Sequence, residues 1–103
     1  MEFIETTIFT KQVQEHLSDK DYNEFQEALI LNPSAGSVIR GSGGLRKIRW
    51  YVEASGKSGG VRVIYYWQNQ KSLIYLLLMY RKNVQENLTQ RELNTLKKIM
   101  ETF

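Results

Sequence analysis

The predicted strand from Leu73 to Tyr80 contains the most apolar stretch of the 103-residue chain, Leu73 to Met79, and it restricts the possible folds more than any other segment. Both of its alternating faces are apolar, which is typical of an interior strand that is covered on two sides. Residues 45–52 and 61–67 also have strand composition, and short connections predict that the three strands pair antiparallel. The apolar stretch is far below the roughly 20 residues that a membrane-spanning helix needs, so no membrane partner is expected.

The N-terminal third of the chain predicts one strand and two helices. Residues 3–9 are rich in β-branched and aromatic types, which favour a short strand. Thr10 is placed to cap a first helix, and Ser18 is placed to cap a second helix, which the Asn32-Pro33 pair ends. The acidic surplus of this part of the chain lies mostly on these two helices.

A third helix is predicted at the C-terminal end. Thr89 and Glu92 have the spacing of a capping box, and the apolar positions that follow share one helix face: Leu93, Leu96, Met100 and Phe103. The complete element order is therefore β-α-α-β-β-β-α. We expect an α+β fold, in which helices pack on a small antiparallel-rich sheet, and a single domain that covers residues 1–103.

Composition excludes several classes of function. The chain has no cysteine, which excludes disulfide frameworks, thiol catalysis and cysteine-based zinc sites. Its one histidine, His16, lies on an acidic helix, so acid–base catalysis by histidine is not expected. Glu2 and Glu5 stand where a secretory signal needs basic and then apolar residues. The prediction is a cytoplasmic protein without a cysteine-based metal site.

The net charge of +3 hides an uneven distribution along the chain. Residues 1–33 hold two basic and seven acidic side chains, a net charge of −5. Residues 34–83 hold nine basic side chains and one acidic side chain, a net charge of +8, and residues 84–103 are balanced. The strongly basic middle segment predicts an anionic partner more clearly than the total charge does.

The predicted strand 45–52 separates its charged and apolar side chains by alternation. Lys47 and Arg49 lie on one face, while Ile48 and Trp50 lie on the other. The apolar face is assigned to the core. The basic face is then available to solvent or to a ligand.

Further basic residues follow on the neighbouring strands. Arg46 has the core-facing parity, so it is expected at the strand edge, reaching around the rim, and Arg62 lies within an otherwise apolar run. The third strand ends with Tyr80-Arg81-Lys82-Asn83, which can bring more cations to the same surface. Clustered Arg and Lys suit phosphate, and nearby aromatic rings suit unpaired bases. A solvated basic face beside core aromatic residues remains the alternative interpretation.

Four segments in order resemble the RelE/HigB-type toxins, with the closest similarity to the HigB-like branch. They are 43–49 (Gly-Gly-Leu-Arg-Lys-Ile-Arg), 59–66 (Gly-Gly-Val-Arg-Val-Ile-Tyr-Tyr), 77–83 (Leu-Leu-Met-Tyr-Arg-Lys-Asn) and the start of the last helix at 88–93. The similarity covers essentially the whole chain. It implies a RelE-like fold and the toxin half of a type II toxin–antitoxin pair.

The resemblance also implies an activity and its residues. Such toxins are ribosome-dependent mRNA endonucleases, in which the ribose 2′-hydroxyl attacks the adjacent phosphate without a metal ion. By position, Lys47 is the candidate for proton transfer, Arg62 would stabilise the phosphorane charge, and Lys82, or Arg81 beside it, would protonate the leaving oxygen or bind phosphate. The expected RNA- or phosphate-binding residues are Arg46, Arg49, Lys57, Tyr80 and Arg81. Where some members carry a tyrosine near the last helix, this chain has Leu88, so that role is absent or passes to a neighbour such as Tyr80.

The implied partners are the ribosome with its mRNA and a cognate antitoxin, which in the HigB-like branch usually has a helix-turn-helix domain. Two other functions stay open at this point. One is a ParE-like member of the same superfamily that inhibits DNA gyrase, although Lys47 and Arg62 argue against it. The other is a catalytically inactive domain that only binds an antitoxin.

Overall fold

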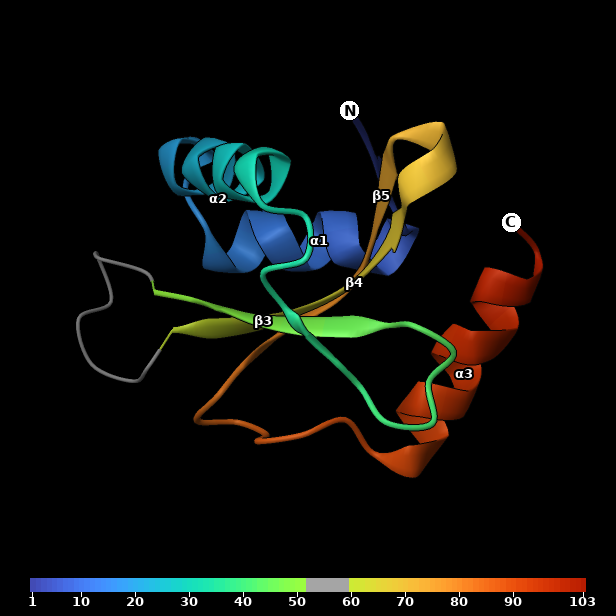
Figure 1. Ribbon diagram of the computed structural model, residues 1–103. Helices are drawn as coiled ribbons and strands as arrows, with labels where there is room; N and C mark the ends of the chain where they lie inside the picture. The colour runs from blue at the N-terminus through green and yellow to red at the C-terminus, as the bar shows by residue number, and fades with distance from the viewer. Residues whose placement is uncertain (52–59) are drawn as a thin grey trace.

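The computed structural model describes residues 1–51 and 60–103, and within them the chain forms three α-helices and a five-stranded sheet (Figure 1). The elements in chain order are β1 (Glu2–Glu5), α1 (Thr7–His16), α2 (Asp19–Leu31), β2 (Ser37–Val38), β3 (Arg46–Trp50), β4 (Val61–Gln68), the 3-10 turn η2 (Asn69–Lys71), β5 (Leu73–Arg81) and α3 (Gln90–Glu101). The predicted α+β fold is confirmed. The predicted strand end at Val52 and the predicted connection at 54–59 lie outside the described residues.

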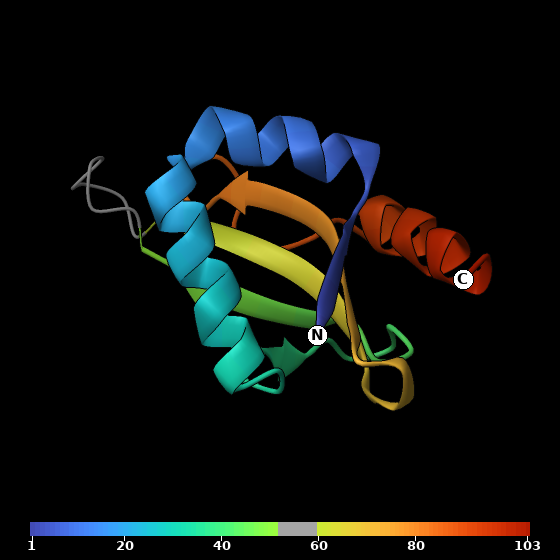
Figure 2. The ribbon, with the colours of Figure 1, turned by 90° about the horizontal axis from the view of Figure 1, so that it is seen from above.

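The sheet has the strand order β1-β5-β4-β3-β2, so the apolar strand β5 is an interior strand, as its composition predicts (Figure 2). The pairs β5·β4, β4·β3 and β3·β2 are antiparallel, whereas β1 runs parallel to β5. The sheet is therefore mixed but mainly antiparallel. One irregularity in the β4·β5 register falls between Ile64 and Tyr65.

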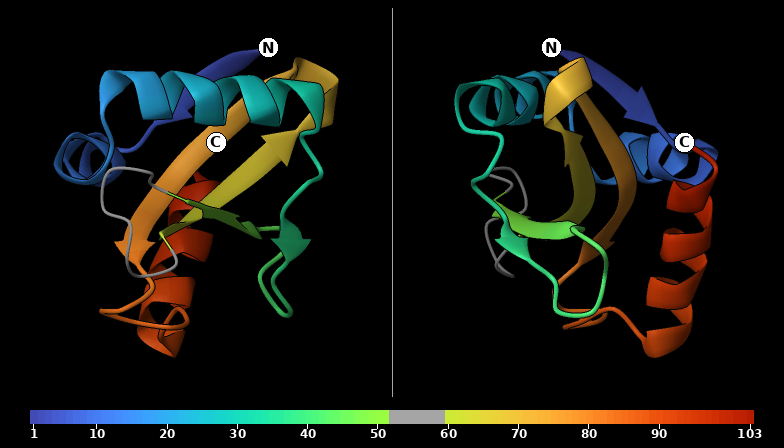
Figure 3. Two further views of the ribbon diagram at one scale, coloured as in Figure 1. Left: turned by 90° about the vertical axis from the view of Figure 1, so that its left-hand side faces the viewer. Right: turned by 45° about the vertical axis from the view of Figure 1, so that its right-hand side comes forward.

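Helices cover the sheet on both sides, with α1 and α2 on one face and α3 on the other (Figures 1 and 3). Under α1 and α2, Phe9, Phe25 and Leu29 pack with side chains of β4 and β5 in one buried cluster. Under α3, Leu93 and Leu96 pack on a second cluster that belongs to the opposite sheet face. Burial on both faces explains why β5 is apolar throughout.

The N-terminal strand and the first helix cap were predicted in the wrong places. The strand β1 ends at Glu5, and Thr6 caps α1 by accepting a hydrogen bond from the Phe9 N–H, 3.0 Å away. Thr6 is also tied to the sheet, because its hydroxyl donates to the Leu77 carbonyl at 2.9 Å. Thr10 instead lies inside α1, where it donates a hydrogen bond to Glu5. The tertiary contact of Thr6 decides between two threonines that are equally good caps locally.

Two smaller features complete the fold. The two-residue strand β2, which pairs with β3 at the sheet edge, was not predicted, because two exposed residues carry no periodic signal. The caps at Ser18 and Thr89 are confirmed, and Thr89 forms a complete capping box with Glu92. Among the helices that the structure describes, none combines the length and hydropathy that crossing a bilayer requires.

Candidate functional site

Three neighbouring strands bring basic and phenolic side chains into one row across the α3 face of the sheet. Arg49 of β3 lies opposite Arg62 of β4, and Arg62 lies opposite Tyr80 of β5. Directly opposed residues in antiparallel strands point to the same face. We call Arg49, Arg62 and Tyr80 the cross-strand row. Lys47 lies on the same face, two residues before Arg49 on β3.

Arg62 is the most buried residue of the cross-strand row. Only 4% of Arg62 is exposed, and the like-charged Arg49 lies directly across from it. Burial of a charged side chain is costly, and like charges placed opposite each other in a sheet are destabilising. A buried arginine with a second arginine beside it is a candidate for anion binding, because guanidinium groups match the oxygens of phosphate and carboxylate.

Tyr80 completes the row with a buried phenol. Its hydroxyl accepts and donates no hydrogen bond within the described part of the chain, although the side chain is only 6% exposed. Burial raises the pKa of Tyr80 above its ordinary value of 10.0, the charge of Arg62 acts to lower it, and the charge of Glu92 acts to raise it. The phenol therefore stays protonated at neutral pH and can donate a hydrogen bond to an anion beside Arg62.

The segment that leads into α3 forms the border of the site. The Lys47 ammonium donates to the Asn87 side-chain oxygen at 3.0 Å, which links β3 to this segment. The Gln85 amide donates to the Glu92 carboxylate at 2.9 Å, and the Thr89 N–H donates to the same oxygen at 2.9 Å. The carboxylate is thus held in place beside the cationic face.

Glu92 keeps its negative charge in this position. Burial acts to raise the pKa of Glu92, but the hydrogen bonds from the Thr89 backbone and from Gln85 outweigh it, and the pKa lies below the ordinary value of 4.5. The site therefore combines cations with one fixed anion. A general acid or base placed between such groups can hold or release a proton.

The remaining sequence-predicted residues occupy other places. Arg46 reaches the α1–α2 side, where its guanidinium donates to the carbonyls of Gly36 at 2.7 Å and Ser34 at 3.2 Å. Arg81 pairs with Val61, a residue of the core under α1 and α2, and so does not share the face of the cross-strand row. Lys82 follows β5 and is exposed, with its N–H bonded to the Gly60 carbonyl. Lys57 lies outside the described residues.

Comparison with known proteins identifies the family. The protein-family model described as the RelE toxin of the RelE/RelB toxin–antitoxin system matches residues 5–103 of this chain. The chain belongs to the RelE toxin family. This RelE-family chain is therefore a toxin of a toxin–antitoxin system, and an antitoxin is its expected partner.

A solved structure supports the same fold. The free state of an E. coli toxin RelE double arginine-to-alanine mutant superposes with a TM-score of 0.57, covering 82% of this chain and 85% of that chain. The sequence identity is 17%, so the similarity concerns the fold alone.

Sequence reasoning missed the side chains that border the site from the α3 segment. The sequence identifies Glu92 only as part of a capping box and gives Gln85 and Asn87 no role. The capping box does predict that Glu92 lies at the start of a helix, but only the packing of α3 on β5 brings it near Tyr80. No local signal predicts that contact.

Proposed function

We propose that this RelE-family toxin is a ribosome-dependent mRNA endonuclease. The ribose 2′-oxygen forms a bond to the adjacent phosphorus while the bond from phosphorus to the 5′-oxygen of the next nucleotide breaks. The 2′-hydroxyl loses a proton, and the leaving 5′-oxygen gains one. The products are a 2′,3′-cyclic phosphate and a free 5′-hydroxyl end. Because the nucleophile belongs to the RNA, the protein needs only to orient the chain, transfer protons and stabilise charge.

The observation that carries this proposal is the cross-strand row with Lys47 beside it. Arg62 is held by the two flanking strands, and its planar guanidinium suits the oxygens of a phosphorane. Arg49, which is exposed, would hold the substrate phosphate at the solvent side. Tyr80 would donate its phenolic proton as a hydrogen bond to the same phosphate. Because strand register fixes the positions of these side chains, they are suited to stabilise the charge that develops on the phosphate in the transition state, rather than only to attract the RNA.

Proton transfer is assigned to the two lysines near the row. Lys47, in its neutral amine form, would accept the proton of the 2′-hydroxyl, and its hydrogen bond to Asn87 holds the side-chain nitrogen on the α3 face. Lys82 would protonate the leaving oxygen or bind its phosphate. The alternation along β5 favours Lys82 over Arg81 for this role, because Arg81 has the parity of the opposite face. Arg46 and Lys57 remain proposed contacts to more distant phosphates.

The proposed partners follow from the same function. The ribosome would present the mRNA to the α3 face, and the antitoxin would block that face or prevent access to the ribosome. An antitoxin with a helix-turn-helix domain is the proposed type, on the basis of the similarity to the HigB-like branch. The proposed compartment is the cytoplasm, where translated mRNA is found.

The test is cleavage of translated mRNA in a reconstituted translation system by wild type, Arg62→Ala and Lys47→Ala. We expect each variant to lower the cleavage rate at least 100-fold, the size typical of lost transition-state stabilisation. Lys71→Ala, which removes one exposed charge from η2, serves as the control and should cut at the wild-type rate. Transcripts cut by wild type should carry 5′-hydroxyl ends. Intact transcripts together with gyrase trapped on DNA would contradict the proposal.

A further inference from the structure

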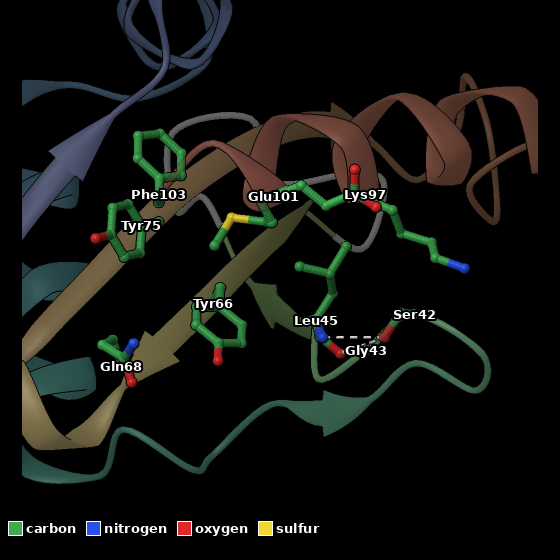
Figure 4. A pocket seen from close by; sticks show the side chains of 10 residues that line it. Ser42, Gly43, Leu45, Tyr66, Gln68, Tyr75, Lys97, Glu101 and Phe103 are labelled. Atoms are coloured by element: carbon green, nitrogen blue, oxygen red, sulfur yellow. Dashed lines mark hydrogen bonds between the residues drawn. The ribbon is translucent and has the colours of Figure 1, made fainter.

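A second feature lies on the same sheet face as the cross-strand row. A pocket of about 280 Å³ opens between the C-terminal half of α3, the loop before β3 and the ends of β4 and β5. Figure 4 shows Tyr75, Phe103 and Gln68 on one side, Leu45 with Ser42 and Gly43 on the other, and Tyr66 between them. The proposed cleavage chemistry uses none of these residues.

Three aromatic rings line the pocket, those of Tyr66, Tyr75 and Phe103. The rings of Tyr75 and Phe103 are stacked, with centroids 4.5 Å apart and an angle of 28° between their planes. The Tyr66 ring lies 6.3 Å from Tyr75. Gly44 comes so close to Tyr66 that a side chain there would meet the ring at 3.2 Å, so the glycine loop packs against the aromatic wall. Flat rings in this arrangement suit a flat ligand.

Polar groups at the rim suit a heteroaromatic ligand in particular. Gln68 offers both a donor and an acceptor, and α3 contributes the Lys97 ammonium and the Glu101 carboxylate. Such a mixed set can pair with the edge of a base, which carries donors and acceptors side by side. The cavity is slightly smaller than the range of sites for drug-sized ligands, which matches a single base.

The pocket also lies in line with the proposed phosphate site. Leu45 forms one wall, and along β3 the same face continues with Lys47 and then Arg49. Two residues of strand span roughly 7 Å, so the pocket begins where the cationic strand surface ends. An RNA strand whose phosphates follow Arg49 and Lys47 would therefore reach the pocket.

We infer that this pocket holds one unpaired base of the RNA, next to the part of the strand bound along β3. The inference rests on the proposed endonuclease function, because it uses the same RNA and the same sheet face. Stacking on aromatic rings holds a base without strong sequence preference, so the pocket would position the strand rather than select a codon.

The experiment uses a labelled single-stranded 2′-O-methyl RNA oligonucleotide, which lacks the attacking hydroxyl and cannot be cut. Fluorescence anisotropy measures its affinity for wild type, Tyr66→Leu, Lys97→Ala and Lys98→Ala. We expect Tyr66→Leu to weaken binding roughly tenfold, as for the loss of one stacked base. Lys97→Ala should weaken binding more than its neighbour Lys98→Ala, which removes the same charge outside the pocket.

A set of oligonucleotides, each with one abasic position, locates the base. One abasic position should cost wild type roughly tenfold in affinity and should cost Tyr66→Leu nothing further. Equal abasic effects in the two proteins, or equal affinities of wild type and Tyr66→Leu, would overturn the pocket assignment. Cleavage of translated mRNA by wild type is measured in parallel. If wild type cuts and the pocket variants bind normally, only the pocket assignment fails; if wild type does not cut, the proposed function fails.

Discussion

The two faces of the sheet are formed by the same strands but differ in the side chains that they carry. On the α1–α2 face, Phe9, Phe25 and Leu29 are fully buried against β4 and β5. On the α3 face, the apolar cluster shares the sheet with the cross-strand row, in which Arg62 is buried. The first face is built for stability. The second carries charges at positions that strand register holds fixed.

A pair of tyrosines shows the difference most directly. The Tyr65 hydroxyl, on the α1–α2 face, donates to the Pro33 carbonyl at 2.7 Å and accepts from the Gly36 N–H at 2.9 Å. The Tyr80 hydroxyl, on the α3 face, is buried with no hydrogen-bond partner in the described ranges. A satisfied hydroxyl contributes to the fold, whereas an unsatisfied one is available to pair with a ligand.

The largest effect is expected in the core under α1 and α2. Phe25→Ala removes a fully buried ring that meets Trp50 edge-on at 5.4 Å. We expect the free energy of unfolding to fall by about 3–5 kcal/mol, the usual range for such a cavity. Urea denaturation followed by circular dichroism measures the change. A loss below about 1 kcal/mol would contradict the assignment of this face as the main source of stability.

Replacement of each tyrosine by phenylalanine compares the faces at constant size. Tyr65→Phe leaves a buried N–H and a carbonyl without partners, so it should destabilise the protein by about 1–3 kcal/mol. Tyr80→Phe removes an unsatisfied hydroxyl, so stability should stay equal or rise, while mRNA cleavage should slow roughly tenfold. Denaturation and cleavage are measured on both variants. The reverse pattern, with Tyr80→Phe the less stable and Tyr65→Phe the slower, would contradict the comparison.

The smallest effect concerns pH. Burial raises the pKa of Tyr80 above 10.0, so above that pH the folded protein keeps a proton that the unfolded chain loses. Stability should then decrease as pH rises, by at most about 1.4 kcal/mol per pH unit for this group. Tyr80→Phe should decline less steeply than wild type in urea unfolding between pH 9 and 11. Burial also raises the pKa of Tyr65, so part of the decline should remain.

Local patterns in the sequence were sufficient to predict much of the fold. Alternation placed Lys47 and Arg49 on one face of β3 and Ile48 and Trp50 on the other, as observed, because side-chain direction in a strand has a period of two. The capping box of α3 and the interior position of β5 were also predicted from local patterns: the spacing of Thr89 and Glu92, and an unbroken apolar run. Each depends only on residues close together in the chain.

Features that depend on distant segments could not be predicted. The parallel pairing of β1 with β5 joins residues about seventy positions apart in the chain. The choice of Thr6 over Thr10 as the cap depends on the contact with Leu77. The border of the site at Glu92 depends on how α3 packs. The candidate site was therefore predicted on the strands and missed on the helix.

The most direct test of the central claim separates stability from cleavage at one residue. Arg62→Lys keeps a positive charge at this buried position but removes the planar guanidinium that suits phosphate oxygens. We expect the variant to remain folded, with a cooperative urea transition, and its mRNA cleavage rate to fall at least tenfold. A variant that unfolds more easily and still cuts translated mRNA at the wild-type rate would show that Arg62 serves the fold and not the reaction.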